Sequence, residues 1–389
     1  MNQFQKYNIR LERIPILDQG ETGRCWLFAG INHLRHLYAN QKNQERELST
    51  VYLSALDKYE KSNCFFDNII NHQEAALDDR MIQHWLNHPC SDLGQWTMFV
   101  NLVNKYGVMP YDALPETKDS MNSWKITACL NNHLRAYAKT LRGKSLSAEK
   151  KDELKMDMLC RIIDLLREYY HFAELPEIIS HSSAKDIAGL RYYSDYFSDY
   201  NLDDYYCFMH APNLEYYQYY DLVGTQNVIE SYPIQYLNLP LDMILQCIIK
   251  QLEDGLTVWF GVDAGKFYDQ QSGFFDVKMQ NNQIDQPVLA LSKAERLDYG
   301  CSIMTHAMNI VGVQRDSGNH PLQWLAENTK GVVFGDEGYI HITNDWMREF
   351  AYQFVIHKKY IPNDTLVMAE QSVHGVLYPW SPLGSLAGF

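Results

Sequence analysis

The order of hydrophobic patterns along the chain is the feature that most restricts its fold. Helical spacing of apolar residues fills the first two thirds, after Cys25, over 49–60, 75–89 and 95–106, from about 147 to 170, and from Pro240 to Leu252. Strand-like apolar runs follow at 257–262, 306–313, 324–327, 338–342 and 350–357. Helices first and strands late predict an α+β protein with segregated lobes, and we find no internal repeat.

Three local features complete this prediction. The opening 14 residues are expected to form an extended arm, and Ser147 is expected to cap the helix that follows it. The stretch 190–220 is rich in Tyr and Asp, and it is interpreted as a segment lying on the surface with its hydroxyls in water.

Composition excludes several classes of protein. The 389 residues are 46% hydrophobic and 21% charged, which is a globular balance, and the formal charge is 34 − 48 = −14. A negative body repels phosphate backbones and anionic lipid, so neither nucleic acid nor a membrane is an expected partner. The N-terminal stretch lacks the apolar core and cleavage site of a secretory signal, and no run approaches the ~18 apolar residues of a membrane span.

The cysteines indicate a reducing compartment. Eight of them are scattered at wide spacing without any CxxC pair, so neither a disulfide scaffold nor a zinc site is indicated. Seven are expected to be small buried apolar residues with free thiols, which predicts a cytoplasmic protein. The remaining one is Cys25.

Cys25 stands where a nucleophile is easily activated. It follows the turn-rich sequence QGETGR and opens an apolar helix, whose first N–H groups and positive dipole end favour a thiolate. Gln19 lies six residues upstream, where its amide can donate to an oxyanion beside the Cys25 N–H. Trp26 would exclude water from one side of the sulfur. A cysteine before an apolar helix is more often a core residue, but Gln19 and the two glycines favour a catalytic role.

A nucleophilic cysteine needs a base and a group that orients the base. His306 opens the apolar run HAMNIVGV, so packing would fix its ring at a strand start. Asn328 ends a second apolar run 22 residues later, within reach of the far ring nitrogen. A histidine at a strand end is more often a solvated or capping residue, and an asparagine before a glycine-containing loop is more often a turn residue.

The weak signals at Cys25, His306 and Asn328 are connected by a resemblance to a known family. The chain resembles the papain-like cysteine peptidases, and more closely their bleomycin hydrolase and aminopeptidase C branch, in order from about residue 15 to its end. The matching segments are DQGETGRCWLFAGINHLR, ELSTVYLSALDKYEKSNCFFDNII, LDDRMIQHWL, GQWTMFVNLVNKYGV, LPET, VWFGVDAGK, KAERL, MTHAM, ENTKG and PWSPLGSLAGF.

The resemblance implies a two-lobe papain-like fold as a single domain over 1–389, with the active-site cleft between a helical and a β-rich lobe. It implies an intracellular aminopeptidase whose triad and oxyanion donor are Cys25, His306, Asn328 and Gln19, working through a thioacyl-enzyme. Neither a metal nor an organic cofactor is required. It also implies peptide substrates with a free N-terminus and a homo-oligomer, a hexamer in the family.

The resemblance further assigns substrate contacts and the origin of the extra chain length. Substrate-binding residues are expected at Gly94, Gln95, Trp26, Ala387 and Phe389. The tail, 376–389, is expected to lie in the cleft, where its carboxylate pairs with the substrate's α-amino group. Base and nucleophile are 306 − 25 = 281 residues apart, against roughly 130–150 in shorter relatives. Helical insertions are therefore expected at about 120–250.

Departures from the family pattern leave alternatives open. Thr329 and Lys330 replace the Ser and Trp of the family's ENSWG, so the His–Asn bond is expected to be wetter and a cation to disfavour the charged base. Leu93 and Thr97 change the family's GGQWDM, and only 24 residues precede Cys25. One alternative is a catalytically weakened assembly or binding protein. The other is an acyltransferase or amidase that uses the same triad.

Overall fold

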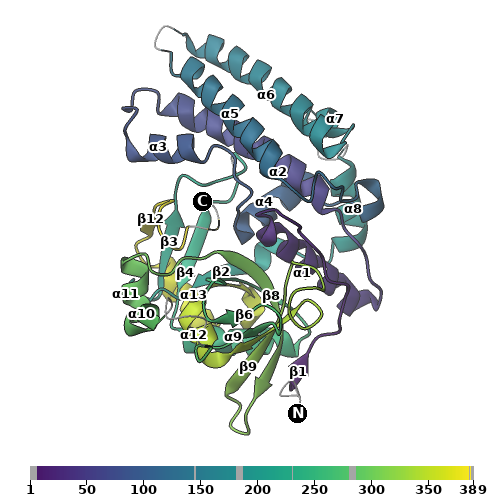
Figure 1. Ribbon diagram of the computed structural model, residues 1–389, viewed down its shortest axis with the longest axis vertical. Coiled ribbons are helices and arrows are strands. Elements are labelled where there is room, and N and C mark those ends of the chain that lie inside the picture. The colour runs from purple at the N-terminus through teal and green to yellow at the C-terminus, as the bar shows by residue number, and fades with distance from the viewer. Residues whose placement is uncertain are drawn as a thin grey trace.

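The computed structural model describes residues 7–143, 146–180, 187–229, 231–279, 286–384 and 386. Most of the helices gather at one end of the molecule and the sheet at the other, with α1 between them (Figure 1). The helices are α1 Cys25–Lys42, α2 Thr50–Asn71, α3 Arg80–Asn87, α4 Trp96–Tyr106, α5 Trp124–Leu141, α6 Ala148–Tyr170, α7 Leu175–Ser180, α8 Ala188–Phe197, α9 Leu241–Glu253, α10 Gln286–Ala290, α11 Lys293–Asp298, α12 Asn344–Phe350 and α13 Asn363–Glu370. Within the described ranges, no helix combines the length and apolar character that a membrane crossing requires.

One continuous sheet forms the other lobe. Its strands are β1 Ile9–Arg10, β2 Tyr205–Met209, β3 Gln218–Leu222, β4 Ile234–Asn238, β5 Val258–Val262, β6 Tyr268–Asp269, β7 Phe274–Phe275, β8 His306–Arg315, β9 Pro321–Glu327, β10 Tyr339–Thr343, β11 Ala351–His357 and β12 Gly375–Leu377. Their order is β12-β3-β4-β2-β11-β5-β8-β9-β10-β7-β6, and β1 of the N-terminal arm pairs with β8. Strand β8 is central and carries His306 at its first residue.

Local signals explain the helices that the sequence predicts. Ser147 caps α6 as expected, because its side chain accepts the N–H of Lys150. Ser49 caps α2 in the same way, by accepting the N–H of Tyr52 at 3.1 Å. Helix α2 is longer than predicted, since it continues to Asn71, and α5 lies in the region of about 120–250 where helical insertions are expected, although its bounds are not predicted.

The Tyr-rich stretch is not the surface segment that the sequence suggested. It forms α8 and then strands β2 and β3, which lie inside the sheet between β12 and β11. Two of its tyrosine hydroxyls donate to backbone carbonyls: Tyr193 to Tyr200 at 2.8 Å, and Tyr200 to Leu37 at 2.8 Å, whereas Tyr196 is exposed as expected. The region 120–250 therefore adds strands as well as helices.

The cysteines are less uniformly buried than the sequence predicts. Cys160 is exposed, and Cys129 and Cys301 are half-buried, which corrects the prediction for these residues, while the others are buried.

Helix α1 is buried between the other helices and the sheet. Every residue from Cys25 to Tyr38 is buried, so the helix is covered on all sides rather than along one stripe. It packs against α2 and α4 on one side and β8 on the other. Asn309 of β8 donates to the Ala29 carbonyl at 2.8 Å, and Trp259 of β5 donates to the Trp26 carbonyl at 3.1 Å. The start of α1 is thus fixed against the strand that carries His306.

Candidate active site

Cys25 is the first residue of α1 and is 3% exposed. Burial raises the pKa of its thiol to about 11, while hydrogen bonds from the backbone at Ala307 and Trp26 and the charge of Lys330 act in the opposite direction. The loop before it turns at Gly20, whose φ is +59° and where a Cβ would overlap the Met121 carbonyl. Sequence and structure therefore agree that this turn delivers the cysteine to a helix N-terminus.

His306 and Asn328 lie together, as the sequence predicted. His306 Nε2 is 2.8 Å from Asn328 Oδ1, which also accepts the N–H of Thr329 at 2.8 Å. Because an amide oxygen only accepts, Nε2 carries the proton and Nδ1 is left as the basic nitrogen. The backbone of Ala307, the next residue of β8, lowers the pKa of the Cys25 thiol through a hydrogen bond, so Cys25 lies against the start of the strand that carries His306.

Electrostatics at this site favour a pair of charges over a single one. Burial lowers the pKa of His306 to about 4, the bond to Asn328 raises it, and Lys330 lowers it further. Burial likewise opposes a lone thiolate at Cys25. Burial alone therefore favours the neutral thiol and the neutral imidazole, and a thiolate at Cys25 would need an imidazolium as its counterion.

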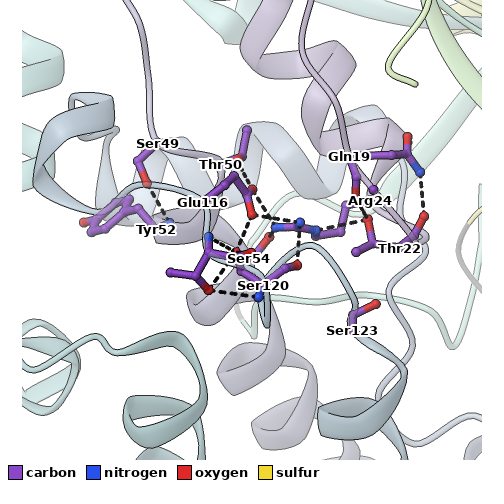
Figure 2. Close-up of polar contacts among 12 residues, drawn as sticks. Gln19, Thr22, Arg24, Ser49, Thr50, Tyr52, Ser54, Glu116, Ser120 and Ser123 are labelled. Carbon is purple, nitrogen blue, oxygen red and sulfur yellow. Dashed lines mark hydrogen bonds and ion pairs between the residues drawn. The ribbon is translucent and has the colours of Figure 1, made fainter. Parts of the chain in front are cut away.

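Gln19 lies against the loop that carries Asn328. It is 2% exposed, and its backbone N–H donates to the Thr329 carbonyl at 2.8 Å. Its side-chain Oε1 accepts from Thr329 Oγ1 at 2.6 Å, and its Nε2 donates to the Thr22 carbonyl at 2.5 Å. Figure 2 shows the Gln19 amide turned toward Thr22. Nε2 carries two N–H groups and Thr22 uses one, so the other can serve an oxyanion.

The two departures beside Asn328 have different consequences. Asn328 and Thr329 are 1% and 0% exposed, so the asparagine end of the bond is covered, against the expectation of a wetter bond. Lys330 extends away from it and donates through Nζ to the Gly20 carbonyl at 2.9 Å. Its charge lowers the pKa of His306, as expected, and also that of Cys25, which the sequence analysis did not consider.

The three expected substrate contacts near α4 are packed together. Trp26 is buried and donates through Nε1 to the Asp92 carbonyl at 2.7 Å. Gly94 lies flat on this indole, because a Cβ there would be 2.5 Å from Trp26 Cδ2. Gln95 is fully buried, and neither its Oε1 nor its Nε2 has a hydrogen-bond partner among the described residues. Gly94 and Trp26, the chain neighbour of Cys25, are therefore fixed against each other.

The described part of the tail is docked along the sheet. Strand β12 pairs in parallel with β3, and the Pro382 carbonyl accepts the N–H of Met304 at 3.2 Å. Leu386 is 1% exposed and packs over Gly261, which pairs with Ala307 beside the base. Ala387 and Phe389, also expected in the site, lie outside the described residues.

Sequence reasoning missed the buried charges around the site. Glu327 is 1% exposed and precedes Asn328; it accepts from Asn32 Nδ2 at 2.5 Å and hydrogen-bonds His36 Nε2 at 2.7 Å. Arg24, next to Cys25, is 2% exposed. The sequence signal that could have identified both residues is a charge directly before a candidate site residue, since Glu327 precedes Asn328 and Arg24 precedes Cys25. In the described part of the chain, no group of three or more His, Cys, Asp or Glu residues is arranged to hold a metal ion.

This architecture is that of a papain-like cysteine peptidase, with the helix that begins at Cys25 packed against the strand that begins at His306. The chain belongs to the Peptidase C1-like family, whose profile matches residues 1–384. Both findings confirm the predicted fold and family, and the chain is a cysteine-type peptidase.

Its relatives fall in the predicted branch. Aminopeptidase C of Streptococcus thermophilus is 34% identical over 98% of this chain and 88% of its own length. Aminopeptidase C of Listeria monocytogenes is 36% identical over 96% and 86%, and bleomycin hydrolase of Gallus gallus is 30% identical over 99% and 89%. The crystal structure of PepW from Lactobacillus rhamnosis superposes with a TM-score of 0.88 at 32% identity, covering 97% of this chain and 88% of that one.

Proposed function

We propose that this protein is an aminopeptidase that cleaves N-terminal residues from peptides through a thioacyl-enzyme. The observation that supports the proposal most strongly is one loop, Asn328 and Thr329, whose hydrogen bonds hold both the ring of His306 and the amide of Gln19. Asn328 holds His306, and the adjacent Thr329 holds Gln19. The base and the donor are thus positioned relative to each other beside Cys25.

The chemistry follows from these positions. The sulfur of Cys25 attacks the peptide carbonyl carbon while His306 Nδ1 takes the thiol proton. The oxyanion receives the N–H of Cys25 and the second N–H of Gln19 Nε2. The C–N bond breaks as the imidazolium returns the proton to the leaving amine. Water, deprotonated by the same nitrogen, then cleaves the thioester and releases the acid.

The nucleophile is tested by substitution and labelling. Cys25→Ala is expected to lower kcat on aminoacyl amides by about 10³–10⁶. Iodoacetamide at low stoichiometry is expected to abolish activity and to map to Cys25. Cys160 is exposed and lies on α6, so Cys160→Ala is the matched control and should leave the rate unchanged. Wild-type activity in Cys25→Ala would refute the assignment.

The restriction to N-terminal residues is proposed to come from the tail. Leu386 packs over Gly261, whose partner strand begins at His306, and the proposal is that the residues after Leu386 block the cleft. Their terminal carboxylate would pair with a free α-amino group and exclude longer N-terminal extensions. The docked residues 375–384 support this proposal, because β12 and the Pro382–Met304 bond hold this part of the tail against the protein, close to the start of β8.

Deletion of residues 384–389 tests the tail. Hydrolysis of aminoacyl amides should fall, and hydrolysis of N-blocked internal peptides should appear. Deletion of only Gly388 and Phe389 is the matched control, since it leaves Ala387 as the carboxylate and should preserve the aminopeptidase mode. An unchanged preference for free amino termini after the longer deletion would refute the role of the tail.

A further inference from the structure

The loop that delivers the nucleophile depends on hydrogen bonds for its shape. All eight cysteines lie in the described part of the chain and all are free thiols, so no disulfide restrains the segment from Gln19 to Arg24. Glycines at 20 and 23 give it conformational freedom. Its position relative to α2 and to the 116–120 segment is nevertheless fixed, because one buried side chain, that of Arg24, bonds to both.

Arg24 uses every donor that its guanidinium has. Nε donates to Thr22 Oγ1 at 3.2 Å, and Nη1 donates to Ser54 Oγ at 3.0 Å and Glu116 Oε1 at 3.1 Å. Nη2 donates to Glu116 Oε2 at 3.2 Å and to the Ser120 carbonyl at 2.7 Å. Figure 2 shows the guanidinium at the centre of these contacts. A planar group with all five N–H bonds engaged has one allowed orientation.

Glu116 is held just as firmly as its partner. Its carboxylate also accepts from Thr50 Oγ1 and from Ser120 Oγ, and the side chains of Arg24 and Glu116 are 3% and 12% exposed. Removing two charges from water costs several kcal/mol per ion, which their attraction offsets only in part. Stability alone therefore gives a weak reason for this pair, and its position beside the nucleophile gives a better one.

Thr22 transmits this orientation to the oxyanion donor. Its hydroxyl accepts from Arg24 and donates to the Gln19 carbonyl at 2.7 Å, and its own carbonyl accepts from Gln19 Nε2 at 2.5 Å. The carbonyl and the side chain of Gln19 thus both hydrogen-bond to Thr22, and Thr22 in turn hydrogen-bonds to the Arg24 guanidinium. A continuous series of hydrogen bonds therefore joins the ion pair to the Gln19 amide.

We propose that Arg24 and Glu116 form a positioning clamp, which acts through Thr22 to hold the Gln19 amide where the oxyanion develops. The inference rests on the proposed role of Gln19. A positioning residue of this kind contributes to the transition state and not to substrate binding, because Gln19 meets full negative charge only there. The clamp is therefore expected to affect kcat and to leave KM unchanged.

Two variants of different severity test the clamp, each alone and combined with Gln19→Ala. Arg24→Gln removes the charge, and Thr22→Val removes only a hydroxyl while keeping the shape. Each should lower kcat by about 10-fold, since a small displacement of a catalytic group costs up to about 10². Neither should lower kcat further in the Gln19→Ala background, because the residue they act through is gone. Thr22→Ser should restore the rate.

A matched control separates positioning from folding. Arg296 is 1% exposed, pairs with Glu349 and binds the Leu291 carbonyl at 2.7 Å, but it lies on α11 in the other lobe. Arg296→Gln should lower the midpoint of unfolding. Any change that it causes in kcat should be the same with and without Gln19→Ala. If Arg24→Gln yields no folded protein, Thr22→Val decides the question.

The possible failures are distinguishable. An unchanged kcat in Gln19→Ala would overturn the proposed oxyanion role. If Gln19→Ala lowers kcat but Arg24→Gln and Thr22→Val do not, the clamp alone is wrong. The clamp is also wrong if these two variants lower kcat by the same factor with and without Gln19, or if they raise only KM.

Discussion

Thr329→Val would show how much the asparagine loop contributes to oxyanion stabilisation. Thr329 is fully buried, and its hydroxyl donates to Gln19 Oε1 at 2.6 Å. Gln19 is itself only 2% exposed. Valine keeps the volume and removes the donor. The Gln19 amide must then either leave Oε1 unsatisfied or rotate and give up its bond to the Thr22 carbonyl.

Both outcomes have a predictable size. A buried acceptor without a donor costs about 1–3 kcal/mol, which should appear as lost unfolding free energy. If the amide rotates instead, the productive orientation loses a bond worth about 1 kcal/mol, and kcat falls by about 5–10-fold. KM should stay unchanged, because the ground-state carbonyl makes little use of this donor.

The assay is steady-state kinetics on an aminoacyl amide together with urea unfolding, for Thr329→Val and for Thr329→Ser. Serine retains the hydroxyl, so its kcat should match the parent enzyme. A Thr329→Val protein that keeps both the unfolding free energy and the kcat of the parent would refute the reasoning, since the Thr329 hydroxyl would then contribute neither to stability nor to the orientation of Gln19.

Two further predictions concern charge and packing. Lys330→Met removes a cation that lowers the pKa of both the thiol and the imidazole, so both pKa values rise and both limbs of the pH–kcat profile move to higher pH; a change in only one limb would contradict this. Gly94→Ala places a Cβ 2.5 Å from Trp26 Cδ2 and should cost about 1–3 kcal/mol in urea unfolding, whereas Gly265→Ala, whose nearest contact is an ordinary 3.8 Å, should stay within about 0.5 kcal/mol.

The parts of the site that the sequence predicted are those with local signals. A cysteine after a glycine-rich turn, and a histidine and an asparagine at the ends of apolar runs, mark element boundaries, and the structure places them there. Arg24 and Glu116 have no such signal, because they are 92 residues apart and nothing in a single sequence pairs them. Both were part of segments recognised by resemblance, yet neither was assigned a role.

The same distinction applies to the fold. The cap at Ser147 depends on residues three positions apart and was predicted correctly. Strand β2 depends on β11, almost 150 residues later, and tyrosines on both of its faces hide the alternation that identifies a strand. The sheet therefore extends further toward the N-terminus than a division into early helices and late strands allowed.

The buried carboxylate of Glu327 couples the two lobes mechanically. It fastens the chain neighbour of Asn328 to Asn32 and His36, on the same helix that begins with Cys25. If α1 moved away from the loop that carries Asn328, the buried Glu327 carboxylate would lose both of its partners. Partial separation is therefore costly, and hinge-like motion of Cys25 relative to Asn328 is suppressed. Inactivation in urea should consequently coincide with the loss of secondary structure, as one cooperative transition with no inactive but folded intermediate.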